Sequence, residues 1–485
     1  MSRRTFPILL VAVSSILLLS PASATTTAYE IASEPQPADP PVSCRTGGGA
    51  ADGQLGGEIG TWSIAISSDG RHVAFSSDAA DLVPGDTNGV TDIFVRDRLT
   101  AATTRVSLST DGRQSYNAFV SHPVISSDGR HVAFASNSLS VVTGETDTPK
   151  PNPLAAPVHP GPYHPPHYVI VRDRDVDGDG VLDEPGSVLT FAVPGGQGQW
   201  HSMSGDGRIV VHEILGPSGN TSLSIYDRDA DGDAILDEPG AVSTTPVPGG
   251  AYPAVTADGR QVAFQRRTGS ASDYRFAVYD VVSGQTTDIA TVLRPRDSYA
   301  PALSATGRFV AMDSSSPAGL HLIDRDADAD SIFDEPGQST TVLVTDKNSS
   351  FIGERGIALA GDGSKLLFGS IDPSLDPAPT SNSRDVYGYD VVTGDITRLS
   401  VPEPDVAQQP TARGSADSAV ISHDGSVVAF MSSGPLVASD RNDVRDVYVK
   451  ANGPGSGGAE APPFAPVNGP LCRSSEALTT WAAEG

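Results

Sequence analysis

The sequence predicts an all-β fold, a seven-bladed β-propeller in which each blade is a four-stranded antiparallel sheet. Three observations lead to this prediction. A nine-residue segment occurs seven times, a second strand-like segment follows each copy, and the 50 Gly and 39 Pro are spread along all 485 residues. Dispersed glycine and proline indicate many turns and few helices, and a long internal repeat indicates a modular array.

The nine-residue segment is SSDGRHVAF at 67–75 and again at 126–134. Looser copies stand at 204–212, 256–264, 304–312, 360–368 and 422–430. The second segment, for example TDIFVRD at 91–97, follows each copy. The copies recur at intervals of roughly 50 to 80 residues, which is typical of propeller blades.

One repeat divides into four expected strands. Residues 62–67 form the first strand, which enters an Asp-Gly turn that suits a tight hairpin. Residues 71–75 return with alternating apolar and polar side chains, and the third and fourth strands are expected at 92–96 and 104–108. One such sheet cannot bury both of its faces, so seven sheets are expected to stack around an axis.

These segments resemble the TolB-like, WD-repeat-like propeller family, whose signature is S-x-D-G-x-x-[VI]-[AV]-F followed by D-[IV]-[YF]-V-x-D. The resemblance extends over residues 40–453. It implies the propeller fold but no single activity, because the family is functionally mixed. The Trp-Asp dipeptide of true WD repeats does not occur in the sequence.

The ends of the chain are expected to lie outside this array. Residues 1–24 have the positive start, short apolar run and small residues before Ala24 that are typical of a cleaved signal peptide. The further segments are a leader at 25–40, the propeller at 41–453 and a Gly- and Pro-rich tail at 454–485. No later stretch reaches the ~20 apolar residues of a membrane-spanning helix. The mature protein is therefore expected to be a secreted, extracellular or periplasmic monomer.

The seventh repeat lacks a fourth strand, because linker-like sequence follows Val449. Residues near 41–46 resemble the fourth strand of the first repeat and are predicted to complete the last blade. Cys44 would lie on that strand and Cys472 in the tail. Two cysteines in an oxidising compartment predict one disulfide between them, and the alternative is a pair of unpaired thiols.

The acidic charge is concentrated in three segments. The formal charge of −27 argues against nucleic acid or an anionic membrane as a partner. Each of the segments 173–184, 227–238 and 324–335 holds six carboxylates and one arginine, −5 apiece and −15 together. Such a density of like charge is self-repulsive, and a bound cation would relieve it.

The segment DRDVDGDGVLDE at 173–184 has the spacing of an EF-hand-type calcium loop, with Gly178 at the sharp bend. The same pattern at 227–238 keeps Gly232, whereas 324–335 has Ala329 there and is expected to be strained. The predicted calcium ligands are Asp173, Asp175, Asp177, Asp179 (through its carbonyl) and Glu184, then Asp227, Asp229, Asp231, Asp233 and Glu238, and then Asp324, Asp326, Asp328 and Glu335. The alternative is a set of solvated acidic hairpins.

These loops are expected to be structural calcium sites rather than switches, because strands and not helices flank them. Each loop connects a third and a fourth strand, so it should lie on the same face as the Asp-Gly turns. The opposite face would carry the variable loops, where recognition usually takes place.

Histidines provide a second set of candidate metal ligands. His159, His164 and His167 lie in or next to the Pro-rich insertion 141–166 and could bind zinc or copper, although an ordered flap is the alternative.

His122, His201 and His212 could stand for the metal-holding histidines of propeller lyases, but their positions in the repeats differ.

The sequence favours a non-catalytic role. No G-x-S-x-G, P-loop, G-x-G-x-x-G or H-E-x-x-H motif occurs. The predicted function is a binding or scaffold module for an extracellular or envelope protein, peptide or glycan. The alternative is a secreted carbohydrate-active enzyme, a polysaccharide lyase or glycosidase, with its site at the central channel.

Overall fold

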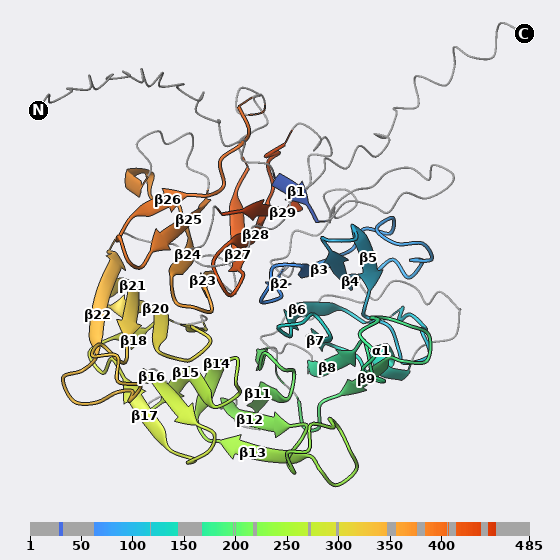
Figure 1. Cartoon of the computed structure of the whole chain (residues 1–485), viewed down its shortest axis with the longest axis horizontal. Helices are drawn as coiled ribbons and strands as arrows, with labels where there is room; N and C mark the ends of the chain where they lie inside the picture. The colour runs from blue at the N-terminus through green and yellow to red at the C-terminus, as the bar shows by residue number, and fades with distance from the viewer. Residues whose placement is uncertain are drawn as a thin grey trace, which may run out of the picture.

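Seven antiparallel sheets stand in a ring in the computed structural model (Figure 1). The structure describes residues 29–32, 63–116, 118–143, 167–196, 198, 200–216, 221–269, 273–296, 300–346, 356–375, 384–404, 406, 414–437 and 445–452. The predicted seven-bladed propeller is thereby confirmed.

The first four blades each contain four strands in chain order. Blade 1 is β2 (Ile64–Ile66), β3 (His72–Ser77), β4 (Asp92–Asp97) and β5 (Ala102–Arg105). Blade 2 is β6 (Val120–Ile125), β7 (His131–Ser136), β8 (Tyr168–Asp173) and β9 (Leu189–Ala192). Blade 3 is β10 (His201–Met203), β11 (Ile209–Leu215), β12 (Thr221–Asp227) and β13 (Ser243–Val247). Blade 4 is β14 (Gly250–Val255), β15 (Gln261–Arg267), β16 (Tyr274–Asp280) and β17 (Thr286–Ile289).

Among the last three blades, blades 5 and 7 vary this plan. Blade 5 has its inner strand in two pieces, β18 (Arg294–Pro295) and β19 (Ala302–Leu303), followed by β20 (Phe309–Ser316), β21 (Ala318–Asp324) and β22 (Thr340–Thr345). Blade 6 is β23 (Ile357–Leu359), β24 (Lys365–Ser370), β25 (Asp385–Asp390) and β26 (Ile396–Arg398). Blade 7 is β27 (Ala416–Ile421), β28 (Val427–Ser432) and β29 (Asp446–Ala451), with β1 (Tyr29–Ile31) beside β29.

The helical content of the described residues is small. It consists of α1 (Ser140–Thr143) and the 3-10 helix η2 (Pro373–Leu375). Among the described residues, no helix has the length and hydropathy needed to cross a bilayer.

The repeated turn is held by its own side chains. In blade 1 the Ser67 hydroxyl donates to the Asp69 carboxylate at 2.6 Å and accepts the N–H of His72 at 2.9 Å. Gly70 has φ of 72°, which permits the reversal into β3. The serine, aspartate and glycine of the motif therefore have separate structural roles, which explains why the three recur together in blades 1, 2, 3 and 7, whereas Thr256, Thr306 and Ala360 replace one of them in blades 4, 5 and 6.

The second residues of the seven turns form a circle of backbone hydrogen bonds around the ring axis. Each N–H donates to the carbonyl of the next blade at 2.7–3.1 Å, with Asp362 as the donor in blade 6, and His423 in blade 7 donates to Ser68 in blade 1 at 2.9 Å. The linked residues are Ser68, Ser127, Gly205, Ala257, Ala305, Gly361 and His423. These bonds satisfy the backbone groups at the inner end of every turn and join all seven blades.

The end of the ring that carries these turns is called the turn face below. The connections between second and third strands and between blades lie at the other end, called the loop face. Helix α1, which follows β7, therefore belongs to the loop face, and residues 144–166 of the predicted insertion lie outside the described residues.

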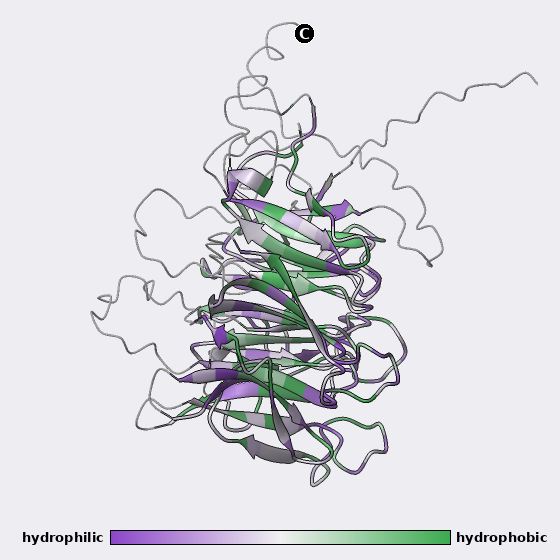
Figure 2. Ribbon diagram, turned by 90° about the vertical axis from the view of Figure 1, so that its left-hand side faces the viewer, coloured by the Kyte–Doolittle hydropathy of each residue, from purple (hydrophilic) through white to green (hydrophobic). Residues whose placement is uncertain are grey.

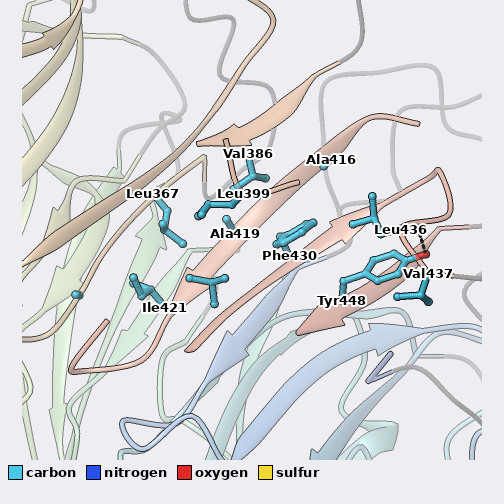
Figure 3. Close-up of a cluster of buried hydrophobic side chains, with 12 residues drawn as sticks. Leu367, Val386, Leu399, Ala416, Ala419, Ile421, Phe430, Leu436, Val437 and Tyr448 are labelled. Carbon is cyan, nitrogen blue, oxygen red and sulfur yellow. Dashed lines mark hydrogen bonds between the residues drawn. The ribbon is translucent and has the colours of Figure 1, made fainter. Parts of the chain in front are cut away.

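The hydrophobic core is divided into clusters between neighbouring blades. Figure 3 shows the cluster between blades 6 and 7, where Leu367 and Val386 meet Ile421 and Phe430. Figure 2 shows the ring from the side, with hydrophobic residues concentrated in the strands. Each sheet thus buries one face against the preceding blade and the other against the following blade, as the stacking argument predicts.

The strand beside β29 differs from the prediction. It is Tyr29–Ile31, whose residue Glu30 is the Cα partner of Val449, and the predicted segment near 41–46 lies outside the described residues. This strand falls within the segment expected to be a leader. Its position is favourable because the Glu30 carboxylate binds Arg98 of blade 1 at 2.9 Å and Ala32 is fully buried against blades 7 and 1.

Several predictions for the chain ends fall outside the described residues. These are the signal peptide at 1–24, the segment 41–46, the tail at 454–485 and the two cysteines Cys44 and Cys472. The disulfide remains a prediction.

Candidate functional site

Three clusters of aspartates lie on the turn face, in the connections β8–β9, β12–β13 and β21–β22. Within each cluster the carboxylate oxygens lie within 4.8 Å of one another. The clusters, called the Asp triplets below, are Asp175/Asp177/Asp179, Asp229/Asp231/Asp233 and Asp326/Asp328/Asp330. This arrangement of carboxylates could hold a metal ion.

The first aspartate of each triplet is buried and organises the loop. The Asp175 carboxylate accepts the N–H groups of Asp179 and Gly180 at 3.1 and 3.0 Å. The equivalent Asp326 carboxylate accepts those of Asp330 and Ser331 at 3.0 and 3.1 Å. The backbone thereby curls around one carboxylate and brings the two exposed aspartates next to it.

The Asp triplets begin two residues later than the predicted ligand sets. Asp173, Asp227 and Asp324, which were expected at the first position, are bound instead by Arg130, Arg208 and Arg308 across the blade. Each arginine makes two hydrogen bonds of 2.7–2.9 Å to its aspartate.

The hydrogen bonds from Arg308 lower the pKa of Asp324, so this carboxylate is a firmly ionised partner of the arginine. These three aspartates therefore end the third strands β8, β12 and β21 in an ion pair with the arginine that directly precedes the second strand of the same blade.

Two further residues differ between the predicted sets and the Asp triplets. Asp179, expected to contribute its carbonyl, brings a carboxylate to its triplet, and Asp330, which was not among the predicted ligands, belongs to the third triplet. The glutamates Glu184, Glu238 and Glu335 are absent from the triplets of the described residues. Counting the Asp-x-Asp-x-Asp pattern from its second aspartate would have identified all nine.

Backbone conformation distinguishes the three loops. Each loop has an aspartate with positive φ near its end, Asp183, Asp237 or Asp334, and two earlier positions with positive φ that are both glycine in the first loop, Gly178 and Gly180 at 70° and 86°. The second loop has Ala234 at one of them, and the third has Ala329 and Ser331 at both. A residue with a Cβ is disfavoured at such angles, so the third loop is the most strained.

A buried arginine anchors each Asp loop to its blade. Arg228 is fully buried, donates to the carbonyl of Gly207 at 2.7 Å and pairs with Asp237 at 2.6 Å. Arg174 and Arg325 make the same contacts in blades 2 and 5. These hydrogen bonds and ion pairs hold the base of each Asp loop without a metal ion.

An aromatic cluster lies in or directly before the first strands of blades 2, 3 and 4, which are β6, β10 and β14. Figure 1 shows β6 and β14 at the inner side of the ring. The rings of His122 and Trp200 are 5.1 Å apart between centroids, and those of Trp200 and Tyr252 are 5.2 Å apart, with interplanar angles of 62° and 63°. These three residues are called the aromatic arc below. Edge-to-face contacts at such distances are favourable for aromatic pairs.

The carboxyl group of Glu213 lies beside the aromatic arc. Its Oε1 accepts the N–H of Tyr252 at 2.7 Å, and the N–H of Glu213 donates to the carbonyl of Trp200 at 3.0 Å. Burial raises the pKa of Glu213 to about 7. The arc was missed in the sequence, but counting back four residues from each turn serine aligns its three members.

The histidines do not gather into a three-ligand metal site within the described part of the chain. His201 and His212 are buried Cα partners on β10 and β11, whereas His122 contacts Trp200. His159 and His164 lie outside the described residues, and His167 precedes β8.

Replacing Glu213 by Gln should make the protein more stable at high pH. A buried carboxyl whose folded-state pKa of about 7 exceeds its ordinary value of 4.5 stabilises the fold only while protonated. That contribution is complete below pH 4.5 and is lost as the pH rises to 7. We therefore expect Glu213→Gln to gain up to about 3 kcal/mol of unfolding free energy at pH 8 and little at pH 4.5.

Denaturant titrations at the two pH values measure this difference, with the exposed Asp395→Asn as the control. Burial also raises the pKa values of Asp86 and Asp313 to about 7. The unfolding free energy of the variant should therefore still depend on pH. Equal gains at both pH values would show that the charge of Glu213 is not responsible.

No protein-family model matches the chain, and no curated protein matches it. Similar solved structures include oligogalacturonate lyase from Vibrio parahaemolyticus, at 12% identity and a TM-score of 0.46, over 81% of this chain and 89% of that one. The β-propeller domain of the trilobed protease from Pyrococcus furiosus has 12% identity and a TM-score of 0.44, over 81% and 95%. TolB from Acinetobacter baumannii has 12% identity and a TM-score of 0.36, over 75% and 77%. In fold, the chain is a seven-bladed β-propeller whose solved structural neighbours include TolB.

Proposed function

We propose that this chain is a secreted binding module for an extracellular protein or glycan, stiffened by structural calcium on its turn face. The observation that carries the proposal is the difference between the two ends of the ring. The turn face is built from repeated groups that bind one another, whereas the loop face carries side chains that differ from blade to blade. A rigid scaffold that presents non-repeated residues at one end is the usual design of a recognition surface.

Calcium suits the Asp triplets because it is a hard cation that prefers carboxylate and carbonyl oxygens. Each triplet supplies three carboxylates on a loop that the buried first aspartate already curls. The strands that flank the loops are fixed in their sheets, so calcium would neutralise charge and fix the loop tip.

A second candidate, a carbohydrate-active enzyme with its site near the ring axis, has one observation in its favour. Burial raises the pKa of both Glu213 and Asp313 to about 7. A carboxyl group that keeps its proton near neutral pH is what a general acid requires.

An array of cell-wall glycans, extracellular peptides and secreted proteins, probed with the calcium-loaded protein, separates the two functions. A binding module should retain at least one array member unchanged. Release of shortened or unsaturated products from a retained glycan would show that the protein is an enzyme and not a binding module. Retention of no member would contradict both.

A further inference from the structure

The aromatic arc occupies one repeated position of the propeller. The residue four before the turn serine, or its equivalent, is aromatic in blades 2, 3 and 4 and small in the other four blades. In order these residues are Ser63, His122, Trp200, Tyr252, Ala300, Gly356 and Ser418. At this position, the first strands of blades 2, 3 and 4 therefore carry aromatic rings, and those of the other four blades carry small residues.

The backbone of this position does not explain the aromatic residues. His122 and Tyr252 have φ of 56° at irregularities in β6 and β14, but Ser418 has φ of 54° at the same irregularity in β27. The bulge is thus a property of the repeat that serine also satisfies. A β-carbon at positive φ is costly, and a large aromatic ring gives no relief from that cost.

Burial of the aromatic rings is also incomplete. His122 is fully buried, whereas Trp200 and Tyr252 are only partly buried. A tryptophan and a tyrosine that only stabilised the core would be expected to bury their rings more fully.

We propose that Trp200 and Tyr252, supported by His122, bind an uncharged sugar ring of an extracellular glycan. This inference rests on the proposed function as a binding module and names its site and ligand class. The apolar C–H face of a pyranose packs on an aromatic ring, and its hydroxyl groups need polar partners at the edge of that ring.

The neighbouring polar groups fit a sugar better than a charged ligand. The buried Glu213 carboxyl accepts the Tyr252 N–H at 2.7 Å, so it lies next to the backbone of the arc, and a carboxyl group can exchange hydrogen bonds with any hydroxyl group that reaches it. The net charge of −27 disfavours a polyanion such as a uronic acid polymer. Successive rings packed at 5.1 and 5.2 Å leave no room between them for an alkylammonium group, which excludes a cation cage there.

The test measures binding of neutral hexasaccharides of glucose, xylose, mannose and N-acetylglucosamine by calorimetry and by tryptophan fluorescence, with oligogalacturonate as the charged comparison. At least one neutral oligosaccharide should bind and change the fluorescence. Trp200→Ala should weaken that binding roughly tenfold or more, Tyr252→Ala should weaken it as well, and Trp200→Phe should weaken it less. The fluorescence change should disappear in Trp200→Phe, because the other tryptophans are Trp62 and Trp481.

Tyr274→Ala is the matched control, because Tyr274 is also partly buried at the loop-face end of blade 4 but on its third strand, β16. Its affinity should equal that of the unmodified protein. If Trp200→Ala fails to fold, Trp200→Phe and Tyr252→Ala carry the same comparison.

The outcomes separate this inference from the proposed function. Binding of an oligosaccharide with unchanged affinity in Trp200→Ala and Tyr252→Ala would overturn the aromatic site but leave a binding module. Capture of a secreted protein without any oligosaccharide binding would do the same. Tighter binding of oligogalacturonate than of every neutral sugar would overturn the ligand class, and cleavage of a bound oligosaccharide would overturn the non-catalytic function while keeping the site.

Discussion

Replacing Gly207 by Ala should lower the free energy of unfolding by about 3 kcal/mol or more. Gly207 ends the turn of blade 3 with φ of 75°, where any residue with a Cβ is strained. A Cβ at this position would also lie 2.4 Å from Nδ1 of His131 in blade 2. His131 is 2% exposed, with its Nε2 3.3 Å from the Asp173 carboxylate, so it has little freedom to move away.

Gly394→Ala provides the control for backbone strain alone. Gly394 has φ of 77° in the turn between β25 and β26, and nothing lies within 4 Å of the position of its Cβ. We expect this substitution to cost about 1 kcal/mol. Denaturant unfolding of the two variants isolates the contact between blades. Equal losses would show that the close approach of the turn to the neighbouring blade contributes nothing.

The architecture could be predicted because most copies of the repeat contain the groups that their own turn needs, with Thr306 in place of the aspartate in blade 5 and Ala360 in place of the serine in blade 6. Ser67, Asp69 and Gly70 bind or bend the same short segment, so their spacing in the sequence is the geometry of the turn. The alternation after the turn then assigns one side of each strand to the preceding blade and the other side to the following blade. The turn and the strand pattern of one repeat, which recur seven times, therefore predict the fold of the whole ring.

The fourth strand of blade 7 could not be placed in the same way. Residues 41–46 resemble a fourth strand in sequence, but a three-residue strand needs only backbone groups to pair with β29. Tyr29–Ile31 gains its position from contacts distant in sequence, the pair of Glu30 with Arg98 and the burial of Ala32 against Val447 and Phe75.

The candidate site was predicted in part for a similar reason. Aspartates at alternate positions were recognised, but the first aspartate of each segment could belong either to a metal loop or to the end of a strand. Only the structure shows that Arg130 binds Asp173 and that the Asp triplet begins two residues later, at Asp175. The aromatic arc combines residues from three blades, and its members become neighbours only when the inner strands are placed side by side.

Removal of calcium should lower the melting temperature by several degrees without abolishing the fold. A ligand that binds only the folded state stabilises it by RT ln(1 + [L]/Kd), about 2.7 kcal/mol per site at a hundredfold excess over Kd. The blade cores and the buried arginines, such as Arg228, do not involve the metal, so the chelated protein should remain a propeller. Thermal unfolding monitored by circular dichroism, in excess calcium and in chelator, measures the difference.

Substitutions in the three Asp triplets should reduce the calcium-dependent shift of the melting temperature by different amounts. Asp177→Ala combined with Asp231→Ala removes one exposed carboxylate from each of the two less strained loops and should abolish most of the shift. Asp328→Ala should matter less, because Ala329 and Ser331 hold φ of 61° and 73° in the third loop and weaken it before any metal binds. Asp395→Ala, in the exposed turn between β25 and β26, is the control and should leave the shift unchanged. Melting curves of the unmodified protein that superimpose with and without calcium would show that the Asp triplets are acidic hairpins without a structural ion.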